Sequence, residues 1–111
     1  MATLSLGHIT VPALPYEPAL VSALIGARLA DVRPVAVIGQ IAPRAVFLIH
    51  AADDANATTT SADEQALYAA ARQPKAQWIV PHGGHVGALD AYPTEYQRRT
   101  LAFFAQYLGR P

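Results

Sequence analysis

Apolar residues recur with helical spacing in the first third of the chain. Leu20, Val21, Leu24, Ile25 and Leu29 follow one another at three- and four-residue intervals. This spacing predicts an amphipathic helix over about 17–32, which Pro34 would stop. The first fifteen residues contain two prolines and show no sustained period, so we expect a connecting segment there. Residues 1–34 are therefore interpreted as an N-terminal connecting segment and helix.

Two short apolar runs in the rest of the chain predict β-strands. The run AVFLI is continuous rather than alternating, which is typical of a strand covered on both faces, and places a strand at about 45–50. The run QWIV predicts a second strand at about 77–81. Before them, the segment from Val35 to Ile41 is expected to form a short helical turn, because Pro43 closes it.

Two further helices are predicted at about 61–73 and 94–108. Each begins with a pattern typical of a capping box, SADE from Ser61 to Glu64 and TEYQ from Thr94 to Gln97. Pro74 ends the first helix and Gly109 the second. In the second helix four aromatic residues lie on one side and are expected to pack in the core, as is Trp78: Tyr96, Phe103, Phe104 and Tyr107.

The predicted order is strand, helix, strand, helix, which requires a crossover between parallel strands. The fold class is therefore α/β, with residues 35–111 forming one C-terminal lobe. Parallel sheets are usually larger than two strands and covered on both faces. The lobe therefore resembles the edge of a larger sheet.

Residues able to carry proton-transfer chemistry follow both predicted strands. Asp53 and Asp54 come directly after the first strand, and His85 follows the second in the sequence HGGH. Functional groups gather beyond the carboxyl ends of parallel strands, so these two loops should lie side by side. A carboxylate bound to one imidazole nitrogen leaves the other nitrogen free to take a proton. Three glycines would let the backbone turn beside His85, namely Gly83, Gly84 and Gly87.

The segment from Val35 to Leu108 resembles the C-terminal part of α/β-hydrolases of the dienelactone-hydrolase and prolyl-oligopeptidase-like kind. The stretches that carry the resemblance are IAPRAVFLIHAADD, WIVPHGGHVGAL and EYQRRTLAFFAQYL. The resemblance implies a serine hydrolase acting on ester or peptide bonds, with Asp54 as the acid and His85 as the base. Asp53 is the less favoured acid. The chain departs from the pattern in two places: Ala51 replaces the usual glycine and costs backbone freedom, and Ala57-Thr58 replaces the usual Val-Pro and would loosen the acid loop.

The nucleophile of that family is missing from the sequence. No G-x-S-x-G motif exists, and the only serines are Ser5, Ser22 and Ser61. Whether the chain is an enzyme is therefore open, and three hypotheses stand. It is an acid and base lobe, inactive alone, whose nucleophile comes from elsewhere; a non-catalytic interaction module; or a small esterase that uses an unrecognised serine, for which Ser5 is the weak candidate. The expected partner is an N-terminal hydrolase half, or a second copy that pairs through the exposed sheet edge.

Composition narrows the other classes of function. Eight lysines and arginines balance eight acidic residues without a basic cluster, which argues against nucleic acid and anionic lipid as partners. Apolar runs are far shorter than the roughly 20 residues of a membrane span, and the N-terminus does not resemble a signal peptide. We therefore expect a soluble, cytoplasmic protein.

No cofactor is expected. A metal site built from His82, His85 and Asp53 or Asp54 is disfavoured, because the two histidines lie in a glycine loop rather than on one helix turn. His50 is expected to end the first strand with its ring bonded to a loop backbone group.

Overall fold

The computed structural model describes residues 3–6, 9–12, 18–28 and 31–109 of the chain. These fall into two compact units, Met1–Arg33 and Pro34–Pro111, which are described separately. None of the described helices is both long and apolar enough to cross a membrane.

The first unit contains a β-hairpin where the sequence predicted an irregular connecting segment. Strands β1 (Thr3–Leu6) and β2 (Ile9–Pro12) pair antiparallel, with Leu4 opposite Val11. Both strands alternate polar and apolar residues, which is the period-two pattern typical of β-strands. Helix α1 (Pro18–Ile25) is shorter than the predicted 17–32, because Gly26 follows it with a φ of 70°. Residues 17, 29 and 30 of that prediction lie outside the described residues.

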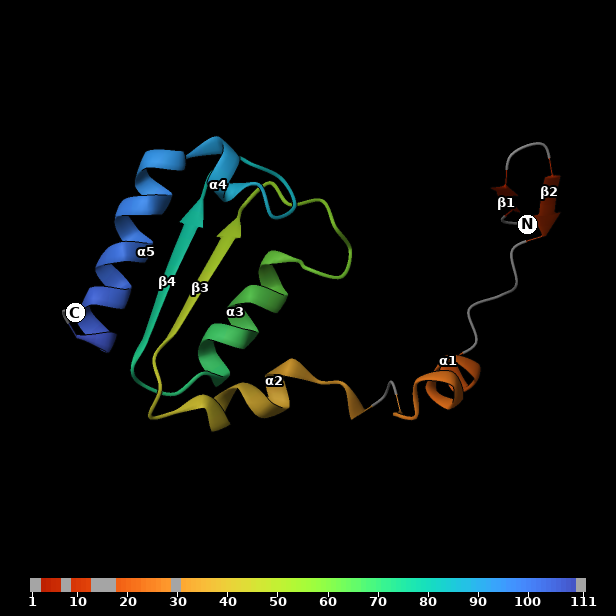
Figure 1. The fold of residues 1–111 in the computed structure, drawn as a ribbon, viewed down its shortest axis with the longest axis horizontal. Coiled ribbons are helices and arrows are strands. Elements are labelled where there is room, and N and C mark those ends of the chain that lie inside the picture. The colour runs from red at the N-terminus through yellow and green to blue at the C-terminus, as the bar shows by residue number, and fades with distance from the viewer. Residues whose placement is uncertain (1–2, 7–8, 13–17, 29–30, 110–111) are drawn as a thin grey trace. The chain divides into compact units, whose positions relative to one another are not determined.

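The second unit is an α/β lobe built around two parallel strands, as predicted (Figure 1). Its elements in chain order are α2 (Pro34–Val37), the 3-10 helix η2 (Ile38–Ile41), β3 (Val46–Ala51), α3 (Ser61–Ala70), β4 (Lys75–Val80), α4 (Ala88–Ala91) and α5 (Pro93–Leu108). Val46 lies opposite Lys75 and Ala51 opposite Val80. The short helical turn ending at Ile41 is confirmed. Strand β4 starts two residues earlier than predicted, and the Lys75 ammonium is held there by the Tyr68 carbonyl at 2.6 Å.

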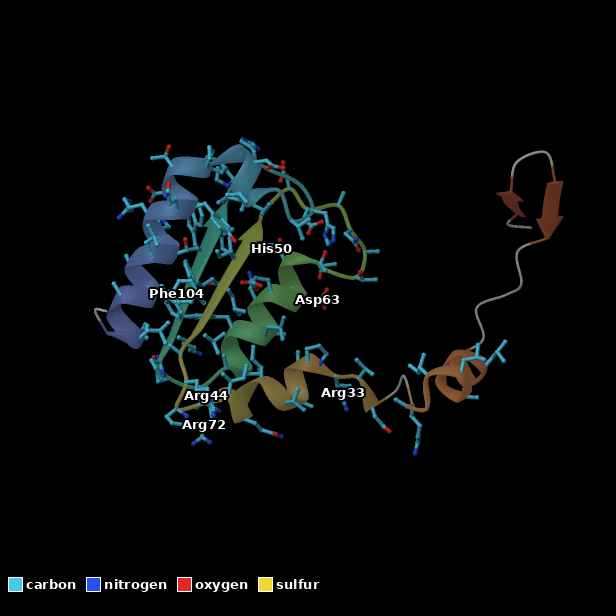
Figure 2. The ribbon with its side chains drawn as sticks, viewed as in Figure 1. Arg33, Arg44, His50, Asp63, Arg72 and Phe104 are labelled. Atoms are coloured by element: carbon cyan, nitrogen blue, oxygen red, sulfur yellow. The ribbon has the colours of Figure 1, made fainter. Side chains whose placement is uncertain are left out.

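Helices α3 and α5 lie on opposite sides of the two strands (Figure 1). The core lies between the strands and the α4–α5 segment: buried Ala51, Val80 and Ala88, with Ile49, Trp78, Tyr92 and Tyr96 packed against them. Phe103 of α5 stacks on Phe47 of β3 with ring centroids 5.2 Å apart. Core packing is therefore confirmed for Trp78 and Tyr96, whereas Phe103 is half-buried against Phe47. It is wrong for Phe104 and Tyr107 of α5, which are 53% and 38% exposed; Phe104 is labelled in Figure 2.

Both predicted capping boxes are wrong in position or kind. Helix α3 is capped by Thr60, whose hydroxyl accepts from the Asp63 amide while the Asp63 carboxylate accepts from the Thr60 amide. The Glu64 carboxylate accepts from the Gln77 side chain at 3.2 Å, and Asp63 reaches back to Thr60 instead, so the box lies one residue earlier than Ser61. The helix ends at Ala70 rather than at residue 73, because Ala71 is extended.

Helix α5 begins at Pro93 without a side-chain cap. Proline at the first helical position is preorganised for the helix, and it lacks the amide that a cap would satisfy. Glu95 in the first turn binds Arg98 and Arg99 instead, with its Oε1 2.7 Å from the Arg99 Nε.

Candidate active site

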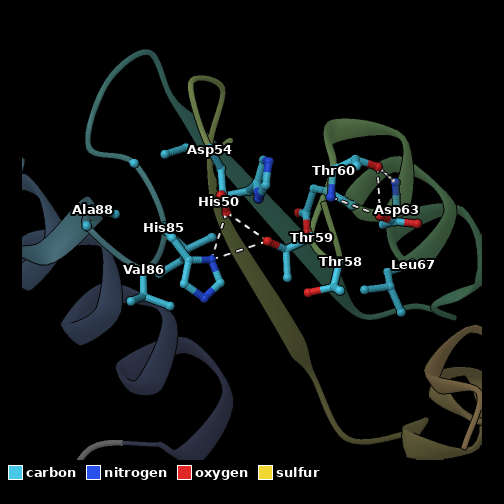
Figure 3. Close-up of a pocket in the computed structure, with 15 residues that line it drawn as sticks. His50, Asp54, Thr58, Thr59, Thr60, Asp63, Leu67, His85, Val86 and Ala88 are labelled. Atoms are coloured by element: carbon cyan, nitrogen blue, oxygen red, sulfur yellow. Dashed lines mark hydrogen bonds and ion pairs between the residues drawn. The ribbon is translucent and has the colours of Figure 1, made fainter. Parts of the chain in front are cut away.

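The loops that follow β3 and β4 meet at the carboxyl end of the sheet (Figure 3). Asp53 and Asp54 lie in the first loop and His85 in the second. The parallel pairing of β3 with β4 places both strand ends at the same edge, as the sequence analysis expected. The structure therefore brings the predicted acid and base residues together.

Asp54 and His85 are within hydrogen-bond distance. The Asp54 Oδ2 is 3.1 Å from the His85 Nδ1, and the Asp54 side chain is only 4% exposed, whereas that of His85 is 47% exposed. When the imidazole carries its proton on Nδ1, that N–H donates to the carboxylate. The Nε2 atom, on the other side of the ring, makes no hydrogen bond within the described part of the chain. This geometry leaves Nε2 able to accept a proton.

Three donors hold the Asp54 carboxylate. Besides His85, the Asn56 amide donates to Oδ1 at 2.9 Å and the Thr59 hydroxyl donates to Oδ2 at 3.0 Å. The Asn56 amide above all, and then His85 and Thr59, lower the pKa of Asp54, against the opposing effect of burial. The carboxylate is therefore ionised at neutral pH.

Thr59 is a site residue that the sequence analysis missed. Its hydroxyl also lies 3.2 Å from the His85 Nδ1, so one hydroxyl contacts both members of the pair. The only signal in the sequence was a run of three threonines in the acid loop. The departure at Ala57-Thr58 does not leave this loop unsupported, because the Asn56 side chain accepts from the Thr58 amide and hydroxyl at 2.9 and 2.7 Å.

Glycines shape the loop that carries His85, as their pattern predicted. Gly83 and Gly84 have φ values of 145° and 66°, which L side chains rarely adopt. A Cβ on Gly87 would overlap the carbonyl of Gly83, so this position needs glycine for close approach. Val86, next to His85, has a φ of 52°, a strained conformation for a β-branched residue.

The Asp53 carboxylate binds backbone amides of the same loop. Its carboxylate accepts from the Gly84 amide at 2.8 Å and from the Gly83 amide at 3.3 Å, and His82 Nδ1 is 3.7 Å away. The Gly84 amide is the largest of the effects that lower the pKa of Asp53. His82 and His85 thus contact different aspartates, and the described residues contain no group of three potential metal ligands.

A pocket of about 230 Å³ opens beside the pair (Figure 3). Its lining comes from the loop after β3 (the acid loop), from α3 and from the loop after β4 (the base loop). It includes Asp54, Thr59, Asp63, Glu64 and His85. Three of these carry carboxylates, and none of the described lining residues is a lysine or arginine. The pocket therefore favours neutral or cationic groups over anions.

His50 lines this pocket at the carboxyl end of β3, as does Asp63 from the first turn of α3 (Figures 2 and 3). Its Nε2 is buried and has no hydrogen-bond partner among the described residues. The expectation that a loop backbone group satisfies this ring is therefore wrong for Nε2. The amides of Asn56 and Thr58 in the loop after β3 donate to the side chains of Asp54 and Asn56 instead.

Within the described part of the second unit, no serine lines the pocket beside His85. Ser61 is an exposed residue at the start of α3 and does not line the pocket. Ser22 lies in α1 and Ser5 in β1, both in the first unit. Comparison of the chain with models of protein families, with curated proteins and with solved structures found no match.

Proposed function

We propose that residues 34–111 form the acid and base lobe of a serine hydrolase of the α/β-hydrolase type, and that the serine comes from outside residues 1–111. The observation that carries the proposal is the 3.1 Å contact between the Asp54 Oδ2 and the His85 Nδ1 at the shared edge of two parallel strands. The resemblance of the two loops to that family supports it.

Asp54 and His85 have complementary roles in this mechanism. Asp54 keeps the imidazole proton on Nδ1 and stabilises the imidazolium that forms. The His85 Nε2 takes the proton from a serine hydroxyl as its oxygen attacks the carbonyl carbon of an ester or amide. The same nitrogen then returns the proton to the departing alcohol or amine. Water repeats the cycle on the acyl-enzyme and releases the acid.

The site carries costs that a purely structural loop would not require. The Asp54 side chain is 4% exposed, and burial of a charge is costly unless several donors compensate it. Val86 adds backbone strain beside His85. Strain and buried charge gather at functional sites, so these features favour the hydrolase lobe over a non-catalytic interaction module.

The unpaired edge of β3 supports the proposal that a partner chain completes the sheet. The Val46 amide donates to the Pro74 carbonyl and the Ala52 amide to the Val80 carbonyl. Because backbone groups alternate sides along a strand, those of Phe47 and Ile49 point away from β4. In the described part of this unit no strand pairs with them. We assign this edge to the half of the hydrolase that carries the nucleophile.

The DNA on both sides of the segment that encodes residues 1–111 tests the proposal. Translation in all frames is expected to reveal a strand followed by G-x-S-x-G and a helix, in frame or in an adjoining gene. That segment, co-expressed with residues 1–111, should copurify with them. Absence of the motif, or a segment that bears it and does not bind, would count against a hydrolase lobe and leave the interaction module.

A further inference from the structure

We infer that Asp53 is a positioning residue for His85, which it orients by fixing the backbone of the loop from Pro81 to Gly87. This inference rests on the proposed function in one respect, that His85 is the base. Asp53 itself touches no reacting group in this account. It acts through two glycine amides that precede His85 by one and two residues.

The contacts are those of an anion bound by consecutive amides. The Gly84 N–H donates to the Asp53 Oδ1 at 2.8 Å, and the Gly83 N–H donates to the Oδ2 at 3.3 Å. Successive backbone amides in a turn form a concave site for negative charge. Here the negative charge comes from the neighbouring loop, so the bonds join the end of β3 to the end of β4.

The loop needs such a restraint because of its composition. Glycine loses more conformational freedom on folding than any other residue, and Gly83, Gly84 and Gly87 all lie within two residues of His85. The contact between Asp54 and the imidazole fixes only the side chain. Asp53 fixes the backbone from which that side chain projects, so the two adjacent aspartates divide the positioning of His85 between them.

Asp53 does not form a second acid and base pair with His82. Both carboxylate oxygens of Asp53 already accept amide protons, and the His82 Nδ1 is 3.7 Å away, beyond hydrogen-bond distance. The His82 side chain is 80% exposed. His82→Ala is therefore a matched control, because it removes the other neighbour of Asp53 and leaves the amide contacts in place.

Nuclear magnetic resonance of the ¹⁵N-labelled full chain tests the inference. In Asp53→Ala we expect amide exchange at Gly84 to rise by about tenfold or more, since a bond to a charged acceptor is lost. The ¹⁵N shifts of the His85 ring should show a smaller Nδ1–H population. His82→Ala should change neither signal. Unaltered Gly84 exchange and unaltered His85 shifts in Asp53→Ala would overturn the inference.

Asp53→Asn keeps the inference testable if Asp53→Ala does not fold. Asparagine offers one acceptor oxygen, so we expect it to preserve the shorter Gly84 bond, lose the Gly83 bond and retain the His85 signal. Faster exchange at neither glycine would contradict the inference. Asp54→Asn separates this result from the proposed function: unaltered His85 shifts in that variant would contradict the acid and base pair, whereas the Gly84 exchange reports on Asp53 alone.

Discussion

At the scale of single residues, the site depends on one buried negative charge. Asp54 accepts from the Asn56 amide, the Thr59 hydroxyl and the His85 ring, and its side chain is 4% exposed. These donors favour the ionised form, so the folded state binds the proton of Asp54 less tightly than the unfolded chain does. Folding stability and the position of the His85 ring are therefore linked through one group.

Acid should remove the stabilisation that Asp54 provides. Its folded pKa is lowered, so its contribution is present above the unfolded pKa of about 3.9 and is lost as the pH falls through the folded value. Urea unfolding at pH 7, 5 and 3 should show a smaller loss of stability for Asp54→Asn than for the wild type. Asp90→Asn, on an exposed position of α4, is the control. An acid dependence equal to that of the wild type in Asp54→Asn would argue against this linkage.

Two glycines of the base loop should respond differently to alanine. Gly84 has positive φ but open space around it, so Gly84→Ala should cost about 1–2 kcal/mol of unfolding free energy. Gly87→Ala should cost more, because its Cβ would overlap the rigid carbonyl of Gly83. Thermal unfolding of the two variants compares them. A smaller loss of stability in Gly87→Ala than in Gly84→Ala would contradict the close approach of the Gly87 and Gly83 backbones.

The strand pattern identified Asp53, Asp54 and His85 as candidates because they follow the two apolar strands, and the family resemblance favoured Asp54 over Asp53. It did not identify Thr59 or the contacts of Asp53, because these depend on how two loops fold against each other. Asp53 reaches amides 30 and 31 residues away, and no local pattern reports that distance. The catalytic roles of Asp54 and His85 stay a prediction.

At the scale of elements, helix α3 and the acid loop share their boundary. Thr60 caps α3 one residue after Thr59 contacts Asp54, so the helix start fixes the end of the acid loop. The Asp63 carboxylate accepts from both the amide and the hydroxyl of Thr60, which lowers the pKa of Asp63. A well-formed helix start therefore also supports the site.

Mutation of two adjacent residues, Thr60 and Ser61, tests which of them caps α3. Thr60→Ala should lower the unfolding free energy by about 1 kcal/mol, because the Asp63 amide loses its acceptor. Ser61→Ala should change stability little, since Ser61 is exposed and already inside the helix. Chemical denaturation of the pair measures the difference. A larger effect at Ser61 would restore the position that the sequence predicted.

Elements with a marked apolar pattern were predictable, and their ends were not. Strands β3 and β4 followed from continuous apolar runs, and α5 from its aromatic side. The starts of α3 and α5 were misplaced because two overlapping capping patterns compete at Thr60 and Ser61, and because Pro93 begins a helix without a cap. The hairpin β1–β2 was not predicted, because Pro12 and Pro15 favoured an irregular segment over the short alternation of its two strands.

At the scale of the second unit, partly exposed apolar side chains lie beside the free edge of β3. A groove there is lined by β3 and α5, including Phe47, Ile49, Phe103 and Phe104. Exposed apolar surface beside an unpaired strand favours association with another chain. We expect the isolated lobe to associate, and its proper partner to suppress that association.

A charge placed in the groove should prevent this association. Phe104→Glu changes a residue that is 53% exposed and lines the groove, so we expect sedimentation to show less self-association and weaker binding of the partner half. Gln106→Glu places the same charge on an exposed position of the same helix, outside the groove, and should change neither. Equal self-association and equal partner binding in both variants would contradict the assignment of the groove to the interface.

Hydrolysis of a p-nitrophenyl ester by residues 1–111 together with the half that carries the serine tests the central claim most directly. We expect activity in the wild-type pair, a loss of about a thousandfold or more in His85→Ala, and near wild-type activity in His82→Ala, whose side chain is 80% exposed in the same loop. Full activity in His85→Ala would contradict the assignment of Asp54 and His85 as the acid and base of a hydrolase.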